Sequence, residues 1–255
     1  MKHSVQRVAH RGGSQLAPEN TLAAFRNALT LPVDAIELDV HMTRDGHAIV
    51  FHDNTVEGRT NGTGNILDLD FAYLRSLNAA AQFPGGWPEP QQIPTLREVL
   101  DVVKGHLQVY IEIKESKRNG VYGSYTHIAE TVIDEVRAAG MLEQVLIISF
   151  DWSILPLVKS LAPTVQTGAL ISKDGWNQLA DFTLERLIQQ VKALGCTWVN
   201  MDRNLFMDNM PGTLNEHGLK LGLWTVNSED ELRRFAAAGV DSLTSDRPDL
   251  FNVLG

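Results

Sequence analysis

Nine short apolar runs, many of them rich in β-branched residues, recur along the 255-residue chain, and most are continuous rather than alternating. Continuous apolar runs are typical of strands that are covered on both faces, as in parallel sheets flanked by helices. Segments with helical spacing lie between many of the runs, which predicts repeated βα units. The predicted strands cover residues 5–10, 35–40, 48–52, 107–114, 145–150, 167–171, 197–201, 220–226 and 240–245.

Capping signals frame several of the predicted helices. Thr95 and Glu98 form an expected capping box at the start of one helix, and Ser228 and Glu231 form another. Asn20 is the expected N-cap of the first helix. The apolar stripes of the predicted helices cover residues 22–29, 96–103, 128–136, 184–191 and 232–236.

The length and the alternation of strands and helices favour a single domain over residues 1–255, folded as a TIM (β/α)8 barrel. Nine predicted strands exceed the eight of such a barrel. We expect the surplus around residues 42–52, where an Asp-Gly turn and no helix separates two runs. An open doubly wound sheet is the alternative. It is disfavoured because no Gly-x-Gly-x-x-Gly loop follows the first strand.

Residues 53–93 interrupt this pattern as a small insertion after the third strand. The segment is rich in Gly, Asn and Pro and holds one short helical piece near Leu67 to Leu77. Insertions of this kind usually lie over the active-site end of a barrel, so we expect the segment to border the active site. A surface elaboration without a role is the alternative.

Composition narrows the classes of partner. A net charge of −9 argues against binding to nucleic acid or to anionic membranes. No apolar run approaches the roughly 18 residues of a membrane span, and no signal peptide is visible, so a cytoplasmic location is expected. The single cysteine, Cys196, excludes an intramolecular disulfide and a Cys-based zinc site, and we expect it to be buried. The oligomeric state stays open.

Side chains that can carry chemistry stand at the ends of predicted strands. In a (β/α)8 barrel, functional residues project from the C-terminal ends of the strands. The candidates, in chain order, are His10, Arg11, Glu37, Asp39, His52, Glu112, Lys114 and Trp224.

The acidic candidates predict a metal site. Glu37 and Asp39 are two residues apart in a strand, so they point to the same face. Together with Glu112 they would repel one another inside a barrel, and burial would raise their pKa values. A divalent cation removes this conflict, and a set of oxygen ligands favours Mg²⁺ or Ca²⁺. The alternative is a set of solvated or ion-paired acids at strand ends.

The histidines and cations complete the pattern. His10 and His52 are candidates for a general acid and a general base, although buried strand-end histidines are often only hydrogen-bonded core residues. Arg11 and Lys114 suit an anionic substrate, and phosphate fits a metal with two cations better than carboxylate or sulfate does. The other histidines are expected in the tail, in turns or beside helices, with no catalytic role: His3, His41, His47, His106, His127 and His217.

Several stretches resemble the glycerophosphodiester phosphodiesterase family, in the family's order and over nearly the whole chain. The stretches are AHRGGSQLAPENTLAAF (9–25), AIELDVHMTRDGHAIVFHD (35–53), IPTLREVL (93–100), YIEIK (110–114), WTVN (224–227) and GVDSLTSDRPDL (239–250).

The resemblance implies a metal-dependent TIM-barrel hydrolase that cleaves glycerophosphodiesters to glycerol 3-phosphate and an alcohol. Its closing strand usually reads Gly-Val-Asp-Gly-Ile, and this chain departs from that pattern at residues 242–245. By position, His10 and His52 match the family's catalytic pair, Arg11 and Lys114 its phosphate contacts, Glu37, Asp39 and Glu112 its metal ligands, and residues 53–92 its insertion. Trp224 is expected to contact the small-molecule substrate.

Two other functions are considered from the sequence. A lysophospholipase D of the same fold would present apolar side chains of the insertion to a lipid tail, and Phe71, Phe83 and Trp87 leave this open. A non-catalytic phosphodiester-binding protein is expected to lack a histidine or a metal carboxylate, whereas this chain has all of them.

Overall fold

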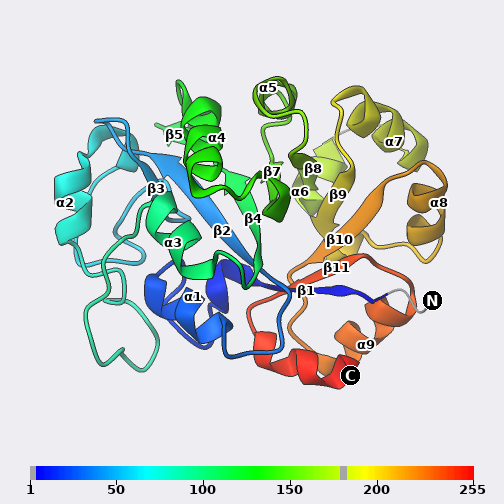
Figure 1. The fold of residues 1–255 in the computed structure, drawn as a ribbon, viewed down its shortest axis with the longest axis horizontal. Helices are drawn as coiled ribbons and strands as arrows, with labels where there is room; N and C mark the ends of the chain where they lie inside the picture. Colours follow the sequence, from blue (N-terminus) through cyan, green and yellow to red (C-terminus); the bar gives the residue numbers. More distant parts are fainter. Residues whose placement is uncertain (1–3, 179–182) are drawn as a thin grey trace.

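Eight parallel strands close into a barrel in the computed structural model, which describes residues 4–178 and 183–255 (Figure 1). Each strand pairs in parallel with its neighbours, and β1 closes the ring by pairing with both β11 and β2. The TIM-barrel prediction is confirmed. The barrel strands are β1 (Gln6–Ala9), β2 (Ala35–Met42), β4 (Gln108–Ile113), β7 (Val145–Ser149), β8 (Gln166–Ile171), β9 (Trp198–Asp202), β10 (Lys220–Trp224) and β11 (Ser242–Ser245).

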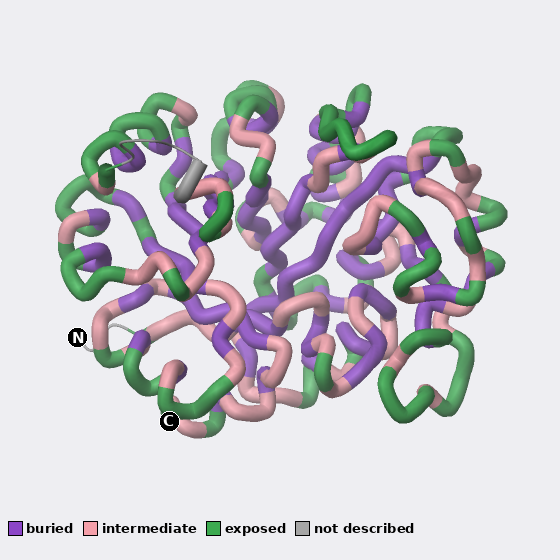
Figure 2. The backbone as a smooth tube through the Cα atoms, turned by 180° about the vertical axis from the view of Figure 1, so that it is seen from behind, coloured by how far each residue is buried: buried purple, intermediate pink, exposed green. Residues whose placement is uncertain are grey.

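Helices surround the barrel, so its strands are the most buried part of the molecule (Figure 2). The Thr95–Glu98 capping box is present. Asn20 is not the N-cap of α1, because Thr21 accepts the hydrogen bond from Ala24 N at 3.2 Å. The barrel helices are α1 (Leu22–Ala28), α3 (Leu96–Val103), α4 (Ile128–Ala139), α5 (Ile154–Leu161), α6 (Lys173–Gln178), α7 (Leu184–Ala193), α8 (Met210–Glu216) and α9 (Glu229–Ala237).

The surplus strand is β3 (Ala48–Val50), which turns back at Asp45–Gly46 and runs antiparallel to β2. Its location confirms the prediction. We had expected His52 to end the third strand of the barrel, but the strand before it, β3, is the antiparallel one. β2 extends past its pairing with β4, β3 returns along it, and Phe51 N donates to Asp39 O at 3.0 Å. This return brings His52 back to the C-terminal end of the barrel.

The insertion forms a lobe beside β2 and β3, with α2 (Phe71–Ser76) at its outer edge (Figure 1). The short helix predicted there is present, preceded by the 3-10 turn η2 (Ile66–Asp68). The lobe has a small apolar core of its own, made by Ile49, Phe51, Val56, Ile66, Leu74, Leu77, Ala79 and Ile93.

A second hairpin, which we had not predicted, follows β4. It consists of β5 (Ser116–Arg118) and β6 (Val121–Gly123), joined by Asn119 and Gly120, both with positive φ. Asn65 Nδ2 donates to Lys117 O at 2.7 Å, so the hairpin is fastened to the insertion.

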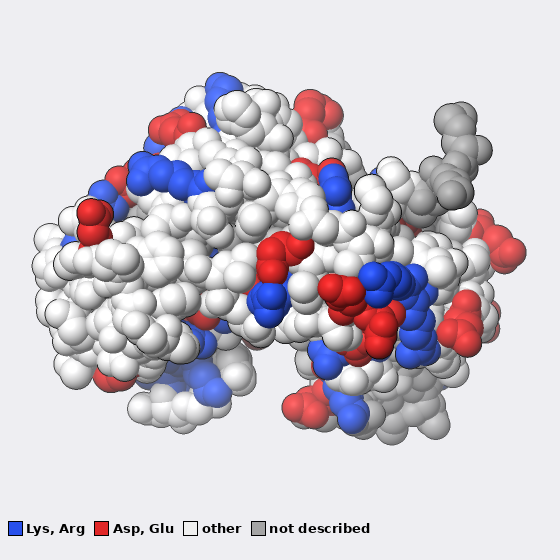
Figure 3. Space-filling view, turned by 90° about the horizontal axis from the view of Figure 1, so that it is seen from below, with Lys and Arg blue, Asp and Glu red and all other residues white. Residues whose placement is uncertain are grey.

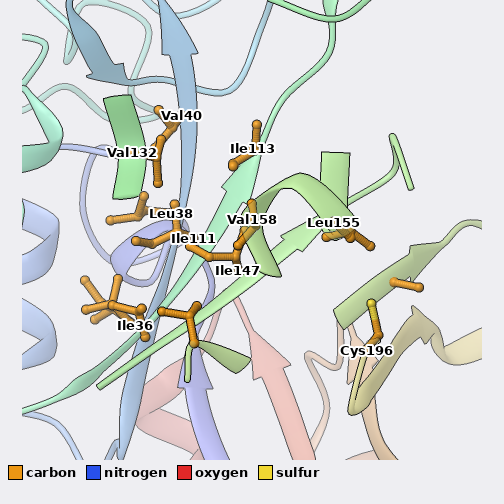
Figure 4. Close-up of a cluster of buried hydrophobic side chains, with 14 of the residues drawn as sticks. Ile36, Leu38, Val40, Ile111, Ile113, Val132, Ile147, Leu155, Val158 and Cys196 are labelled. Atoms are coloured by element: carbon orange, nitrogen blue, oxygen red, sulfur yellow. The ribbon is translucent and has the colours of Figure 1, made fainter. Parts of the chain in front are cut away.

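The main core lies between the strands and the surrounding helices. Figure 4 shows Ile36, Leu38 and Val40 of β2 beside Ile111 of β4 and Val132 of α4. Cys196 is buried in this core, as predicted. The alternate residues of the strands face inward and fill the barrel. This inner cluster is Val8, Ala35, Tyr110, Leu146, Ile148, Leu170 and Trp198, with Trp224 packed against it.

The surface carries both signs of charge. On the face seen in Figure 3, Lys and Arg lie beside Asp and Glu rather than apart from them. Within the described ranges, no helix has both the length and the apolar character that a membrane span needs.

Candidate active site

A tight turn places the first candidates at the mouth of the barrel. After β1 the chain enters the short turn η1 (His10–Gly12), in which Arg11 has φ 52° and Gly12 has φ 82°, and Gly13, which follows it, has φ 98°. A Cβ atom on Gly12 would lie 2.7 Å from Ala24 Cβ, and one on Gly13 would lie 2.8 Å from Pro248 Cγ. Glycine is therefore required at both positions for conformation and for space.

The three predicted metal ligands come together. Glu37, Asp39 and Glu112 are buried, and each offers a carboxylate oxygen within 4.8 Å of the others. Asp39 pairs with Glu112 in the register of β2 and β4. Burial and the two neighbouring carboxylates raise the pKa of Glu37 well above its usual value. Asp39 is as deeply buried, yet Arg11 and Lys114 hold its pKa below the usual range.

Two cations, whose side chains are largely but not fully buried, lie beside these carboxylates. Arg11 Nη1 lies 3.0 Å from Glu19 Oε1, and Arg11 Nε lies 3.2 Å from Asp39 Oδ2. Lys114 Nζ lies 2.6 Å from Glu112 Oε1 and 3.5 Å from Asp39 Oδ1. Burial alone would lower the pKa of Lys114, but the carboxylates outweigh it and raise that pKa.

The carboxylate cluster fits a hard divalent cation. All three donors are oxygens, which Mg²⁺ and Ca²⁺ prefer. Asp39 Oδ1 is buried without a hydrogen-bond partner among the described residues, so its lone pairs are available to a metal ion. Arg11 N donates to Glu37 Oε2 at 3.0 Å and orients that carboxylate.

Each candidate histidine is held by a carboxylate of its own. His10 Nδ1 lies 2.5 Å from Asp246 Oδ1, and His52 Nδ1 lies 2.7 Å from Asp53 Oδ1. A carboxylate accepts, so Nδ1 is the protonated nitrogen and Nε2 is left for other partners. The hydrogen bond from His52 lowers the pKa of Asp53.

Asp246 was not among the site residues predicted from the sequence. Burial opposes its ionisation, but hydrogen bonds from His10, Ser14 and Asn227 outweigh burial and lower its pKa. Asp246 directly follows the closing strand, which pairs with β1. A carboxylate at the end of a strand next to His10 was the signal that could have identified it.

His41 was also misjudged, because it lies in β2 and is completely buried. Its Nε2 lies 3.0 Å from His52 O and its Nδ1 lies 2.7 Å from Tyr125 Oη. Burial lowers the pKa of His41 to about 4, so the ring is neutral. It supports the backbone of His52. Of the other histidines, His3 lies outside the described residues, and the exposed ones are His47, His106, His127 and His217.

Two cavities meet at these residues. The smaller, of about 220 Å³, is enclosed by the strand ends and lined by His10, Arg11, His52 and Trp224, among others. The larger, a groove of about 1270 Å³, shares His52 with it. The groove is also lined by Asn54 and Thr55, which lie at the start of the insertion.

Acid–base groups around a cavity at the C-terminal ends of barrel strands are typical of (β/α)8 enzymes, and the comparisons identify this one as a phosphoric diester hydrolase. The chain belongs to the glycerophosphoryl diester phosphodiesterase family, whose profile matches residues 10–250. The glycerophosphodiester phosphodiesterase of Caldanaerobacter subterraneus subsp. tengcongensis is 34% identical over 253 residues, which cover 97% of this chain and 96% of the relative.

Solved structures agree on the fold. A putative glycerophosphoryl diester phosphodiesterase from Silicibacter pomeroyi superposes with a TM-score of 0.86 at 24% identity, covering 100% of this chain and 94% of its own. A phosphodiesterase from Oleispira antarctica, solved in complex with the product sn-glycerol-3-phosphate, superposes with a TM-score of 0.81 at 24% identity. That match covers 98% of this chain and 96% of the other.

Proposed function

We propose that this enzyme hydrolyses glycerophosphodiesters to sn-glycerol 3-phosphate and an alcohol, with a divalent metal and a histidine pair. One observation carries the proposal. The two imidazoles, each held through Nδ1 by a carboxylate, line the same enclosed cavity as Glu37 and Glu112. The product bound by the Oleispira antarctica neighbour supports the choice of substrate.

The carboxylates Glu37, Asp39 and Glu112 would hold the metal. A bound Mg²⁺ or Ca²⁺ would offset their negative charge and stabilise charge on the phosphoryl oxygens. Among the described residues, the carboxylate contacts of Arg11 involve Nη1 and Nε, so Nη2 remains for a phosphate oxygen. Lys114 adds a point charge beside Glu112.

The positions of the two histidines suggest a division of roles. His52 lines both the enclosed cavity and the outer groove, whereas His10 lines the enclosed cavity. If the glycerol end of the substrate occupies the small cavity, the leaving alcohol extends into the groove, beside His52. His52 Nε2 then gives a proton to the leaving oxygen as its bond to phosphorus breaks, and His10 Nε2 takes one from the attacking hydroxyl, which belongs to water or to the glycerol moiety.

The size and lining of the groove also indicate which leaving alcohols the enzyme can accept. It is several times larger than the enclosed cavity, and it is lined by both apolar and charged side chains, such as Phe150, Trp152 and Glu115. We therefore propose that the enzyme tolerates different alcohols. Phe71, Phe83 and Trp87, which motivated the lysophospholipase D alternative, are not among the described residues that line either cavity. The cytoplasmic location stays a prediction.

Release of glycerol 3-phosphate from purified protein tests the proposal. We expect turnover of glycerophosphocholine and glycerophosphoethanolamine with comparable kcat/KM, loss of turnover after chelation, and recovery with Mg²⁺ or Ca²⁺. A thermal melt of the chelated protein is the control, since unfolding also abolishes activity. Full activity after exhaustive chelation would contradict the metal proposal, and turnover of long-chain lysolipids alone would favour the lysophospholipase D alternative.

A further inference from the structure

The enclosed cavity has two unlike walls. The turn after β1 and the strands β2 and β4 contribute charged or titratable groups, among them His10, Glu37 and Glu112. The opposite wall, from β7 to β10, is mainly apolar and includes Ile148 and Leu170. A phosphate with its metal belongs to the first wall, because the cations and the carboxylates are there. The rest of the bound substrate must face the second.

Asn200 of β9 is the one amide side chain among the described residues that line this cavity. It is 3% exposed, and its Nδ2 has no hydrogen-bond partner among the described residues. The indole Nε1 of Trp224, which lines the same cavity from the adjacent strand β10, is likewise buried and without a partner in the described ranges. Buried donors without partners destabilise a fold, so they point to a ligand that completes them.

The two strands beside Asn200 leave space for its amide. A Cβ on Gly168 of β8 would lie 2.5 Å from Asn200 Nδ2, and a Cβ on Gly222 of β10 would collide with Asn200 Oδ1. Neither glycine has a positive φ, so the backbone conformation does not require glycine at either position. Glycine is needed at both positions because a side chain there would collide with the amide of Asn200, which lines the cavity.

An amide both donates and accepts hydrogen bonds, as a hydroxyl does. We infer that Asn200, together with Trp224 Nε1 in the same cavity, binds a hydroxyl of the glycerol moiety and selects substrates that carry one. The inference rests on the proposed function and extends it, because it assigns the glycerol end of the substrate to the wall opposite the phosphate. Asn200 is a substrate-binding residue in this scheme, and it moves no proton.

Asn200→Leu tests the inference, because leucine keeps the approximate size and removes both polar atoms. The substrates are glycerophosphocholine and bis(p-nitrophenyl) phosphate, a phosphodiester without glycerol. We expect kcat/KM to fall by about 10- to 100-fold for glycerophosphocholine and by less than about 3-fold for the nitrophenyl diester. An equal loss with both substrates would overturn the inference, since a merely structural role affects both.

Thr167→Val is the matched control. Thr167 is a fully buried polar residue of β8 next to Gly168, and it is not among the described residues that line either cavity. Removal of its hydroxyl should leave the ratio of kcat/KM for glycerophosphocholine to kcat/KM for the nitrophenyl diester unchanged.

Product binding gives a second measurement that needs no turnover. In calorimetry with metal-loaded protein, Asn200→Leu should weaken binding of sn-glycerol 3-phosphate and leave binding of inorganic phosphate unchanged. Asn200→Ala serves the same purpose if the leucine variant does not fold. Unchanged binding of sn-glycerol 3-phosphate would overturn the inference. Failure of the unsubstituted enzyme to cleave glycerophosphocholine would instead contradict the proposed function, so the two failures are distinguishable.

Discussion

Polar side chains line both ends of the barrel, but they are partnered differently. At the N-terminal end, Arg7 donates two side-chain hydrogen bonds and one backbone hydrogen bond to Asp34, all at 2.9 Å. Nearby, Tyr110 Oη donates to Gln6 Oε1 at 2.7 Å, and Gln6 Nε2 donates to Gln108 Oε1 at 2.6 Å. These groups satisfy one another.

At the C-terminal end, several buried polar atoms have no hydrogen-bond partner among the described residues. They include Arg11 Nε, Asp39 Oδ1, Asn200 Nδ2 and Trp224 Nε1. Cavity size alone does not identify the active-site end, because the N-terminal cavity, of about 660 Å³, is larger than the enclosed cavity of about 220 Å³ and smaller than the groove of about 1270 Å³. Thr167 Oγ1 and Ser242 Oγ, in the first halves of β8 and β11, also lack a partner among the described residues, but neither residue is among those that line these cavities. Unpartnered polar atoms at a cavity therefore mark the end that binds a ligand, and the paired groups around Arg7 and Asp34 stabilise the barrel.

Removing an imidazole from the C-terminal end should have the largest effect on rate. His10→Ala and His52→Ala should each lower kcat by roughly 10²- to 10⁴-fold, the usual range for general acid–base catalysis. Both side chains are partly exposed to the cavity, so the melting temperature should change little. Steady-state kinetics and a thermal melt of each variant measure the two effects. Near-normal turnover in either variant would show that its histidine has only a structural role.

Arg11→Lys should have a smaller effect at the same end. The lysine keeps the charge but loses the planar fork that reaches both Glu19 and a phosphate oxygen. We expect kcat/KM for glycerophosphocholine to fall by about 10- to 100-fold, the value of a charge-assisted hydrogen bond. Arg59→Lys is the matched control, because Arg59 also contacts Glu19 but is more exposed. Equal losses in the two variants would contradict a phosphate contact at Arg11.

Asp34→Asn at the N-terminal end should have the smallest effect, and it should act on stability rather than rate. Burial opposes ionisation of Asp34, but hydrogen bonds from Arg7 outweigh burial and lower its pKa. Its contribution is therefore present above the unfolded pKa of about 4 and is lost as the pH falls through the lower folded pKa. Both side chains are partly exposed, so we expect only about 0.5–1 kcal/mol at pH 7.

Urea unfolding of the parent protein and of Asp34→Asn, at neutral pH and at decreasing pH below 4, measures this effect. The difference in unfolding free energy should shrink as the pH falls, while kcat at pH 7 stays the same in both proteins. A large loss of kcat would remove the contrast between the two ends.

The parts of the site that follow from local spacing were predictable. Glu37, Asp39 and Glu112 were identified because alternation within a strand and the ends of apolar runs are visible in the sequence. The chain path to His52 was not, because the direction of β3 depends on which strand it pairs with. The hairpin at Asn119–Gly120 had a local signal, since that pair favours a two-residue turn, and we overlooked it.

Contacts between residues far apart in the sequence could not be predicted from local sequence patterns. Asn20 resembled a helix cap, but its Nδ2 donates to Asp39 Oδ2 at 2.8 Å, a contact that exists only when β2 lies beside the first turn. The position of Asn200 over two glycines likewise depends on the neighbours that the barrel gives to β9.

The partner of His10 has a consequence for how the enzyme becomes active. His10 lies in the turn after the first strand, and Asp246 follows the last, 236 residues later. During synthesis the histidine emerges from the ribosome long before its carboxylate does. Its ring acquires the Nδ1–H···Asp246 bond only when β11 docks against β1. Growing chains should therefore lack an oriented His10, and hydrolysis should begin only after the barrel has closed.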